Sequence, residues 1–565
     1  MLNESLIAKT EKKVYNFLPH EPETIAVTLF IIGMGAYYLW RMFAITPVFT
    51  ELYTYYNFIS RGPVYSALHW TMPNDHIGYA VIASILTLLG NSYLGLRGVS
   101  FVCAIVNLIL MYKITSRYYS HGLPLASTIL YASMKMVNEF SVQGRGYTLG
   151  TTCFLAGIYL LGDICKAGES RKPHFKLLGF FMVLGIYTVP ISVLWVLPTC
   201  VAAFTFLFIN GMRSRSVYGN NSENIYYRKL KGILGVSAVS MIVTMFLYSA
   251  VWLSLGTNLL VNAEGAMEKY GGLKSSVLLR TPGKAWFTGA DLMMSQAYVQ
   301  KIDTQAFSRQ FGNWIFEVLE MITPGVSMVV ILFLVTGLSV LLVECIRHFE
   351  YSRTVINLIV IVNFILVGFM LVIRHELPYA ESFFFGGVLI SLCICGVLEK
   401  IINFGIRIYN GIMENTDADN APHKEIEIIN KTDKWYNSAF VYLPVLVIFI
   451  YFLIRISGPQ FNMQLGEREN DLFNSLYVAN VSNKSKIAAL DCDQRYLLKF
   501  GWNIDCLNTD VTGCDLVILD KVLLEDEYLG ENHWKFYAFH DDINWDYIES
   551  MHVRYENENF LVYTR

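Results

Sequence analysis

Charged residues are scarce in this chain. Asp, Glu, Lys and Arg make up 16% of its 565 residues, whereas a soluble domain carries about 25%. Hydrophobic residues reach 54%, and the mean hydropathy is +0.41. This composition excludes an ordinary soluble protein and predicts a polytopic α-helical membrane protein. The net charge of −3 is too small for a nucleic-acid partner.

Paired cysteines are also absent. The ten cysteines show neither the spacing of a metal site nor that of a disulfide framework. Most lie in apolar runs, where a free thiol behaves as a small hydrophobic group. Only Cys492, Cys506 and Cys514 lie in a polar region. The sequence shows no internal repeat, and its polar N-terminus predicts no cleavable signal peptide.

Apolar runs of about 20 residues, the length that spans a bilayer, are abundant. About eleven such spans are predicted, at residues 24–46, 97–114, 121–140, 146–163, 175–190, 191–209, 231–255, 325–344, 354–373, 381–398 and 438–457. The turn at Thr188-Val189-Pro190 separates the fifth run from the sixth, because proline stops a helix.

The distribution of Lys and Arg predicts the orientation of these spans. With the N-terminus in the cytoplasm, the inner loops are rich in basic residues, as the positive-inside rule requires. An odd number of spans then leaves the C-terminal region outside. We expect a multi-pass protein of the plasma membrane, and the Lys-, Asn- and Ile-rich composition favours a bacterial one.

The first outer loop, about residues 47–96, contains one more apolar stretch. Residues 77–90 would form a helix of about 21 Å, too short for a hydrocarbon core of about 30 Å. Counting this stretch as a span would also move the basic loops outside. We therefore expect an interfacial, juxtamembrane helix on the outer leaflet.

Three further segments are predicted to lie off the membrane. Residues 256–324 form a long outer loop of the gating type, and residues 399–437 form an inner loop with some helix. Residues 459–565 follow the transmembrane domain of residues 1–458 as a small extracytoplasmic α/β domain. The short apolar runs that indicate its strands are residues 486–490, 514–520, 534–540 and 559–565.

Four polar clusters fall at the predicted outer ends of helices. They are Glu51, Asn74-Asp75-His76, Gln143 to Tyr147, and Arg374 to Glu381. Taken singly, each is more typical of an interface residue, a helix cap or a headgroup contact. Together they supply a carboxylate, which can take a proton from a hydroxyl, and cations, which can stabilise a phosphate leaving group. Their shared depth favours one site.

These motifs, in this order, resemble those of the GT-C glycosyltransferases, specifically the protein O-mannosyltransferases and lipid A aminoarabinose transferases of glycosyltransferase family 39. The matching positions are Glu51 in the first outer loop, Pro73-Asn74-Asp75-His76, Gly90, Arg97, Gln143 to Tyr147, and Arg374 to Glu381. Departures from the family are a lone Glu51 instead of an acidic pair, no prolines after His76, and no acidic residue before Arg145.

The resemblance implies a GT-C fold with a polyprenyl-phosphate sugar donor and an extracytoplasmic acceptor, which could be a glycan, a lipid or a protein. It implies an inverting transfer in which Glu51, or alternatively Asp75, is the base. The donor phosphate would be held by Arg145 and Arg374 with His76 or His375. Further site candidates are Tyr147, Tyr379 and Glu381.

A divalent metal is conceivable through Glu51, Asp75 or Glu381. The predicted outer loops contain no Asp-x-Asp motif, and we therefore expect no metal cofactor.

Two other functions stay open. A flippase or transporter of lipid-linked sugars would have inverted repeats and charges near the midplane; Lys135 and Glu139 in the third predicted span fit the second feature. A ligase or polymerase using a diphosphate-linked glycan would rely on outer Arg and His without a carboxylate base.

Overall fold

A computed structural model describes most of the chain. The described residues are 21–69, 76–119, 122–166, 174–215, 224–255, 283, 286, 290, 298–300, 306–349, 351–417, 435–458, 467–478, 486–489, 492–504, 511–521 and 543–565. The predicted strand at 534–540 and the candidate residue Asp75 lie outside them, as does most of the 256–324 loop.

Long helices dominate the part of the chain that the structure describes. They are α2 (Pro22–Ala44), α6 (Ser92–Tyr118), α9 (Tyr147–Ile164), α10 (Phe175–Thr188), α11 (Val193–Arg213), α13 (Ile225–Leu255), α17 (Phe307–Ile322), α18 (Ser327–Arg347), α19 (Arg353–Arg374), α20 (Gly386–Asp417) and α21 (Trp435–Ser457). Among the described residues, eight helices are long and apolar enough to cross a membrane. The protein is thus a multi-pass membrane protein, as its composition predicts.

Helices occupy all eleven predicted span positions, but two of them are shorter than expected. The apolar helices at 123–132 and 175–188 have 10 and 14 residues. The inner segment 399–437 is also more helical than predicted, because α20 continues to Asp417. The predicted stop at Thr188-Val189-Pro190 is confirmed: α10 ends at Thr188, and the short helix η3 (Pro190–Ser192) follows.

The run predicted to span at 121–140 is two helices, so a single continuous span there is wrong. Helix α7 (Leu123–Ala132) ends at Ser133, and α8 (Lys135–Val142) starts after the extended Met134. The Ser133 hydroxyl donates to the Leu130 carbonyl, and the Asn138 amide donates to the carbonyls of Ala132 and Met134. Such side-chain bonds offer the backbone an alternative to the helical ladder.

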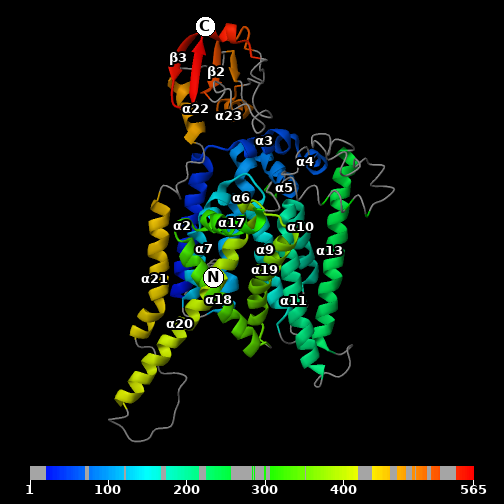
Figure 1. The fold of residues 1–565 in the computed structure, drawn as a ribbon, viewed down its shortest axis with the longest axis vertical. Helices are drawn as coiled ribbons and strands as arrows, with labels where there is room; N and C mark the ends of the chain where they lie inside the picture. The colour runs from blue at the N-terminus through cyan, green and yellow to red at the C-terminus, as the bar shows by residue number, and fades with distance from the viewer. Residues whose placement is uncertain are drawn as a thin grey trace, which may run out of the picture.

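The segment predicted as the first outer loop is built from short helices at one end of the bundle. They are α3 (Phe49–Asn57), η1 (Ile59–Arg61), α4 (Pro63–Leu68), α5 (Ile77–Leu86) and η2 (Thr87–Leu89). The predicted helix at 77–90 is therefore confirmed as a helix, which ends at Gly90 with a φ of +76°. Figure 1 shows α3, α4 and the C-terminal sheet at the same end of the molecule, opposite the tip of α20.

The C-terminal region forms the small α/β unit that the alternating pattern predicted. Helices α22 (Glu467–Val478), α23 (Cys492–Trp502) and α24 (Trp545–Glu549) accompany four strands in the order β1-β2-β4-β3. Strands β1 (Ile487–Ala489), β2 (Leu516–Asp520) and β4 (Phe560–Thr564) were predicted, whereas β3 (His552–Glu556) was not. The pairing is parallel for β1 with β2 and antiparallel for the other two pairs.

Aromatic side chains join this unit to the first outer loop. Tyr496 of α23 stacks on Tyr56 of α3, with ring centroids 5.4 Å apart and an interplanar angle of 10°. The hydroxyl of Tyr496 also accepts a hydrogen bond from the Asn57 amide at 3.1 Å. Phe500 packs against Tyr93 at 4.9 Å, next to the start of α6. The α/β unit therefore rests on the helix that carries Glu51.

Candidate functional site

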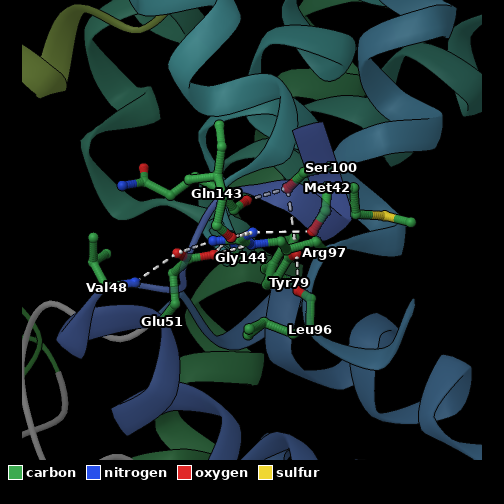
Figure 2. Close-up of polar contacts among 10 residues, drawn as sticks. Met42, Val48, Glu51, Tyr79, Leu96, Arg97, Ser100, Gln143 and Gly144 are labelled. Atoms are coloured by element: carbon green, nitrogen blue, oxygen red, sulfur yellow. Dashed lines mark hydrogen bonds and ion pairs between the residues drawn. The ribbon is translucent and has the colours of Figure 1, made fainter. Parts of the chain in front are cut away.

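Glu51 and Arg97 form a buried ion pair between α3 and α6. The Arg97 guanidinium donates from Nε to Glu51 Oε1 and from Nη2 to Oε2, both at 2.8 Å. Both side chains are almost inaccessible, at 0% for Glu51 and 1% for Arg97. The remaining arginine nitrogen, Nη1, donates to the carbonyls of Met42 and Ile45 at 3.0 and 2.6 Å. Figure 2 shows these bonds converging between α2, α3 and α6.

Two backbone groups complete the surroundings of the Glu51 carboxylate. The Val48 amide donates to Oε2 at 3.0 Å, so the carboxylate caps the start of α3, while the Gly144 amide donates to Oε1 at 2.5 Å. Each oxygen thus accepts two hydrogen bonds, and no surface of the carboxylate remains accessible. In place of the free carboxylate expected at position 51, the structure has an anchor that joins three segments of chain.

The turn at residues 143–147, itself one of the four predicted clusters, contacts one residue from each of the other three. Its Gly144 amide binds Glu51, its Gly146 amide binds the Nδ1 atom of His76 at 2.7 Å, and its Tyr147 hydroxyl donates to Glu381 at 3.0 Å. The backbone of this 143–147 turn is held from α6, because the Ser100 hydroxyl donates to the carbonyl of Gln143 at 2.6 Å. The convergence of these clusters is the central geometric feature of the site.

The two glycines of the turn are required by close packing. A Cβ at Gly144 would lie 2.6 Å from the Leu96 side chain and 3.0 Å from its carbonyl oxygen. A Cβ at Gly146 would lie 2.6 Å from Thr188 and 3.1 Å from the Cβ of His76. Only glycine lets the two amides approach their acceptors this closely. The spacing Gly-Arg-Gly therefore places Arg145 between two fixed backbone contacts.

His76 precedes α5 and is buried within the site. Since Nδ1 accepts the Gly146 amide proton, the neutral ring carries its own proton on Nε2. That Nε2 donor has no hydrogen-bond partner among the described residues. Burial, with a further contribution from the nearby Arg145 charge, holds the pKa of His76 well below its ordinary value. His76 is consequently a neutral hydrogen-bond donor rather than a cation.

Tyr147 lies at the centre of the site. Its ring stacks on Phe140 at 4.5 Å, meets His76 edge-on at 4.7 Å, and lies 5.7 Å from the Phe384 ring. The Arg145 guanidinium is 5.7 Å from the same ring, within cation–π range. Tyr147 is thus packed on several sides, and its hydroxyl donates to Glu381.

Arg374 and His375 lie apart from the 143–147 turn. Arg374 ends α19 with its side chain 42% exposed and forms an ion pair with Glu376 at 2.8 Å. His375 is exposed, adopts a left-handed φ of +52° and contacts the Phe307 ring. Tyr379 is also exposed, and its backbone amide donates to the Tyr298 carbonyl at 2.8 Å. Of the fourth cluster, only Glu381 reaches the turn.

The structure adds contacts that sequence reasoning did not assign, and it pairs two charges noted in the third predicted span. Arg97 was noted only as a family match, although an arginine within a predicted span is costly and marks a functional or pairing residue. The Ser100 hydroxyl donates to the Gln143 carbonyl of the turn, and the Tyr79 hydroxyl donates to the Leu96 carbonyl. No motif in the sequence indicates either bond. Lys135 and Glu139 form a 3.7 Å ion pair on α8.

The described part of the chain shows no candidate metal site. Within the described ranges, no three His, Cys, Asp or Glu side chains are placed to hold a metal ion. Asp75 lies outside those ranges, and metal independence stays a prediction.

The eight long apolar helices and the buried polar site beneath one end of the bundle define a multi-pass membrane protein with a candidate catalytic face. Residues 76–252 match the family model of the dolichyl-phosphate-mannose-protein mannosyltransferases. The matched segment includes His76, Arg97 and the 143–147 turn. This match confirms the resemblance to GT-C superfamily membrane glycosyltransferases.

Two solved structures are similar to the chain. One is the archaeal oligosaccharyltransferase AglB from Archaeoglobus fulgidus in complex with an inhibitory peptide and a dolichol-phosphate, at 12% identity and a TM-score of 0.43, with 84% of this chain and 63% of that chain covered. The other is an Archaeoglobus fulgidus oligosaccharyltransferase in the apo form, at 12% identity and 0.43, with coverages of 80% and 58%. The chain therefore spans about three fifths of these proteins. Curated protein sequences include no significant match.

Proposed function

We propose that this protein transfers a sugar from a polyprenyl-phosphate donor to an acceptor hydroxyl on the extracytoplasmic side, with inversion at the anomeric carbon. The observation that carries the proposal is the convergence of Glu51, His76 and Glu381 on the 143–147 turn. The match of residues 76–252 to a lipid-phosphate-dependent mannosyltransferase family supports the same chemistry.

The charges at this face suit an anionic lipid donor. Arg145 supplies a guanidinium, which binds phosphate oxygens in a bidentate manner. His76 supplies a neutral N–H donor whose proton lies on Nε2, because Nδ1 accepts from Gly146. Arg374 supplies a second, more exposed guanidinium at the end of α19. We assign Arg145 and His76 to the donor phosphate, and Arg374 with His375 to the approach of the lipid headgroup.

In this proposal Glu51 is a positioning residue and not the general base that the sequence predicted. A general base needs a lone pair that faces the incoming hydroxyl, whereas the Glu51 oxygens face Arg97 and two backbone amides. We propose that Glu51 positions α3 and the 143–147 turn and that another carboxylate accepts the proton. The alternative assignment to Asp75 stays a prediction.

The purified protein in lipid vesicles provides the test. Polyprenyl-phosphate [¹⁴C]mannose is the probe donor, and a threonine-containing peptide and membrane-extracted glycolipids are the acceptors. We expect release of polyprenyl phosphate together with a labelled product whose anomeric configuration is opposite to that of the donor. The absence of any release with all acceptors would contradict the proposal.

A ligase acting on a diphosphate-linked glycan is a second candidate, favoured by the full occupancy of the Glu51 carboxylate. Such an enzyme would turn over a polyprenyl-diphosphate sugar and leave the monophosphate probe unchanged. Parallel assays with the two donors therefore separate the two functions.

A further inference from the structure

We propose that Glu381 is the general base of the transfer and that Tyr147 positions it; this inference rests on the proposed function. Glu381 lies in the short helix η5 (Ala380–Phe383) and is exposed, whereas the residues around the 143–147 turn that it meets, His76, Arg145 and Tyr147, are buried. Its Oε2 atom accepts a hydrogen bond from the Tyr147 hydroxyl at 3.0 Å, and Oε1 has no further hydrogen bond to the described residues.

Two other described carboxylates near the site are paired with cations. Glu51 is bonded by Arg97 at 2.8 Å, and Glu376 faces Arg374 at 2.8 Å. A carboxylate held in an ion pair is a weaker proton acceptor, because the cation favours its ionised form. Glu381 is held instead by a neutral phenol, which orients the group and leaves one oxygen for an incoming hydroxyl.

The backbone around Glu381 is fixed from two sides. The Trp314 indole of α17 donates to the Pro378 carbonyl at 2.7 Å, and the Tyr379 amide donates to the Tyr298 carbonyl at 2.8 Å. An isolated β-bridge joins Val299 to Pro378. The base is thus carried on a segment that is bonded to its neighbours, as a precisely placed catalytic group requires.

Tyr147 contacts both the proposed base and the groups proposed to hold the phosphate. Its hydroxyl donates to Glu381, while its ring meets the His76 ring edge-to-face and lies 5.7 Å from the Arg145 guanidinium. One side chain thus links the proton acceptor to the phosphate-binding groups.

The reaction then proceeds in one displacement. The acceptor oxygen forms a bond to the anomeric carbon as its proton passes to Oε1 of Glu381. The bond between the anomeric carbon and the phosphate oxygen breaks, and its electron pair stays on the phosphate, which Arg145 and His76 stabilise. Protonated Glu381 afterwards returns its proton to water.

The test compares Glu381→Gln with the wild-type protein, with polyprenyl-phosphate [¹⁴C]mannose as the probe. We expect turnover to fall by about 10²–10⁴-fold, the usual contribution of a general base, with the KM for the donor changed by less than about threefold. Glu317→Gln is the matched control, since Glu317 is exposed on α17 and forms no ion pair within the described residues. This control should retain wild-type turnover.

Two more variants distinguish catalysis from structure. Glu381→Ala should regain activity with added formate, which can accept the proton in place of the missing carboxylate. Tyr147→Phe removes the hydrogen bond that orients the Glu381 carboxylate, so kcat should fall while the KM for the donor changes little.

The outcomes distinguish the assignment of Glu381 as the base from the proposed function. Wild-type turnover of the probe with undiminished activity of Glu381→Gln overturns the assignment of the base and leaves the proposed function standing. An inactive wild-type protein with every acceptor overturns both. Loss of activity in Glu381→Gln together with failure of formate rescue in Glu381→Ala, at unchanged unfolding temperatures, overturns the base and makes Glu381 a residue for acceptor binding.

Discussion

The Glu51–Arg97 pair makes the sharpest prediction about stability. Glu51→Gln keeps the size of the side chain but removes its charge from a site with four converging donors. A glutamine oxygen can accept about two of these bonds, and its amide meets the other donors unfavourably. Two lost charge-assisted bonds at about 1.5–3 kcal/mol each give a loss of about 3–6 kcal/mol. Breaking a buried ion pair typically costs about 3–5 kcal/mol.

The measurement is a double-mutant cycle for Glu51→Gln and Arg97→Gln, with unfolding followed in mixed detergent micelles. We expect each single variant to lose at least about 3 kcal/mol and the coupling energy to reach about 2–3 kcal/mol, the upper range for residues in contact. Arg117 and Asp163 provide the matched control, because their 3.0 Å ion pair is exposed. Their coupling should be below about 1 kcal/mol.

One result would refute this reasoning. If Glu51→Gln unfolds at the wild-type midpoint and couples to Arg97 by less than about 0.5 kcal/mol, the pair is not an anchor. A loss of turnover in that well-folded variant would then return the role of general base to Glu51.

Two further predictions concern acid stability and the C-terminal unit. Because the pKa of His76 is lowered by folding, the unfolded chain binds more protons, and stability should fall as the pH decreases below about 6.5. His76→Asn keeps an acceptor for the Gly146 amide and should flatten this dependence; equal slopes for both proteins in unfolding experiments from pH 7.5 to 5 would contradict it. Tyr496→Ala removes the stack on Tyr56, an aromatic pair worth about 0.5–1.5 kcal/mol beyond its buried area. It should speed proteolytic release of the α/β unit several-fold, while Tyr477→Ala, an exposed control on α22, should not.

Sequence patterns located the membrane helices because hydrophobicity acts locally. A helix that crosses lipid satisfies its own backbone hydrogen bonds, so a run of apolar side chains is sufficient to indicate it. The stop at Pro190 was predicted because proline breaks a helix. The helix at 77–90 and three of the four C-terminal strands were predicted from short apolar runs, which are also local signals. The break at Ser133 was missed because it depends on the competing hydrogen bonds of Ser133 and Asn138, which leave the hydropathy unchanged.

The motif order also indicated the glycosyltransferase resemblance and the residues that meet at the 143–147 turn. Sequence by itself therefore determined a multi-pass helical membrane protein and proposed a set of candidate site residues. Only the tertiary structure decided which charges neutralise one another. Glu51 is paired because packing brings α6 and its Arg97 within 2.8 Å, and Glu381 is available because its contact is the neutral Tyr147. A carboxylate's chemistry depends on such distances and on burial, which no spacing along the chain specifies.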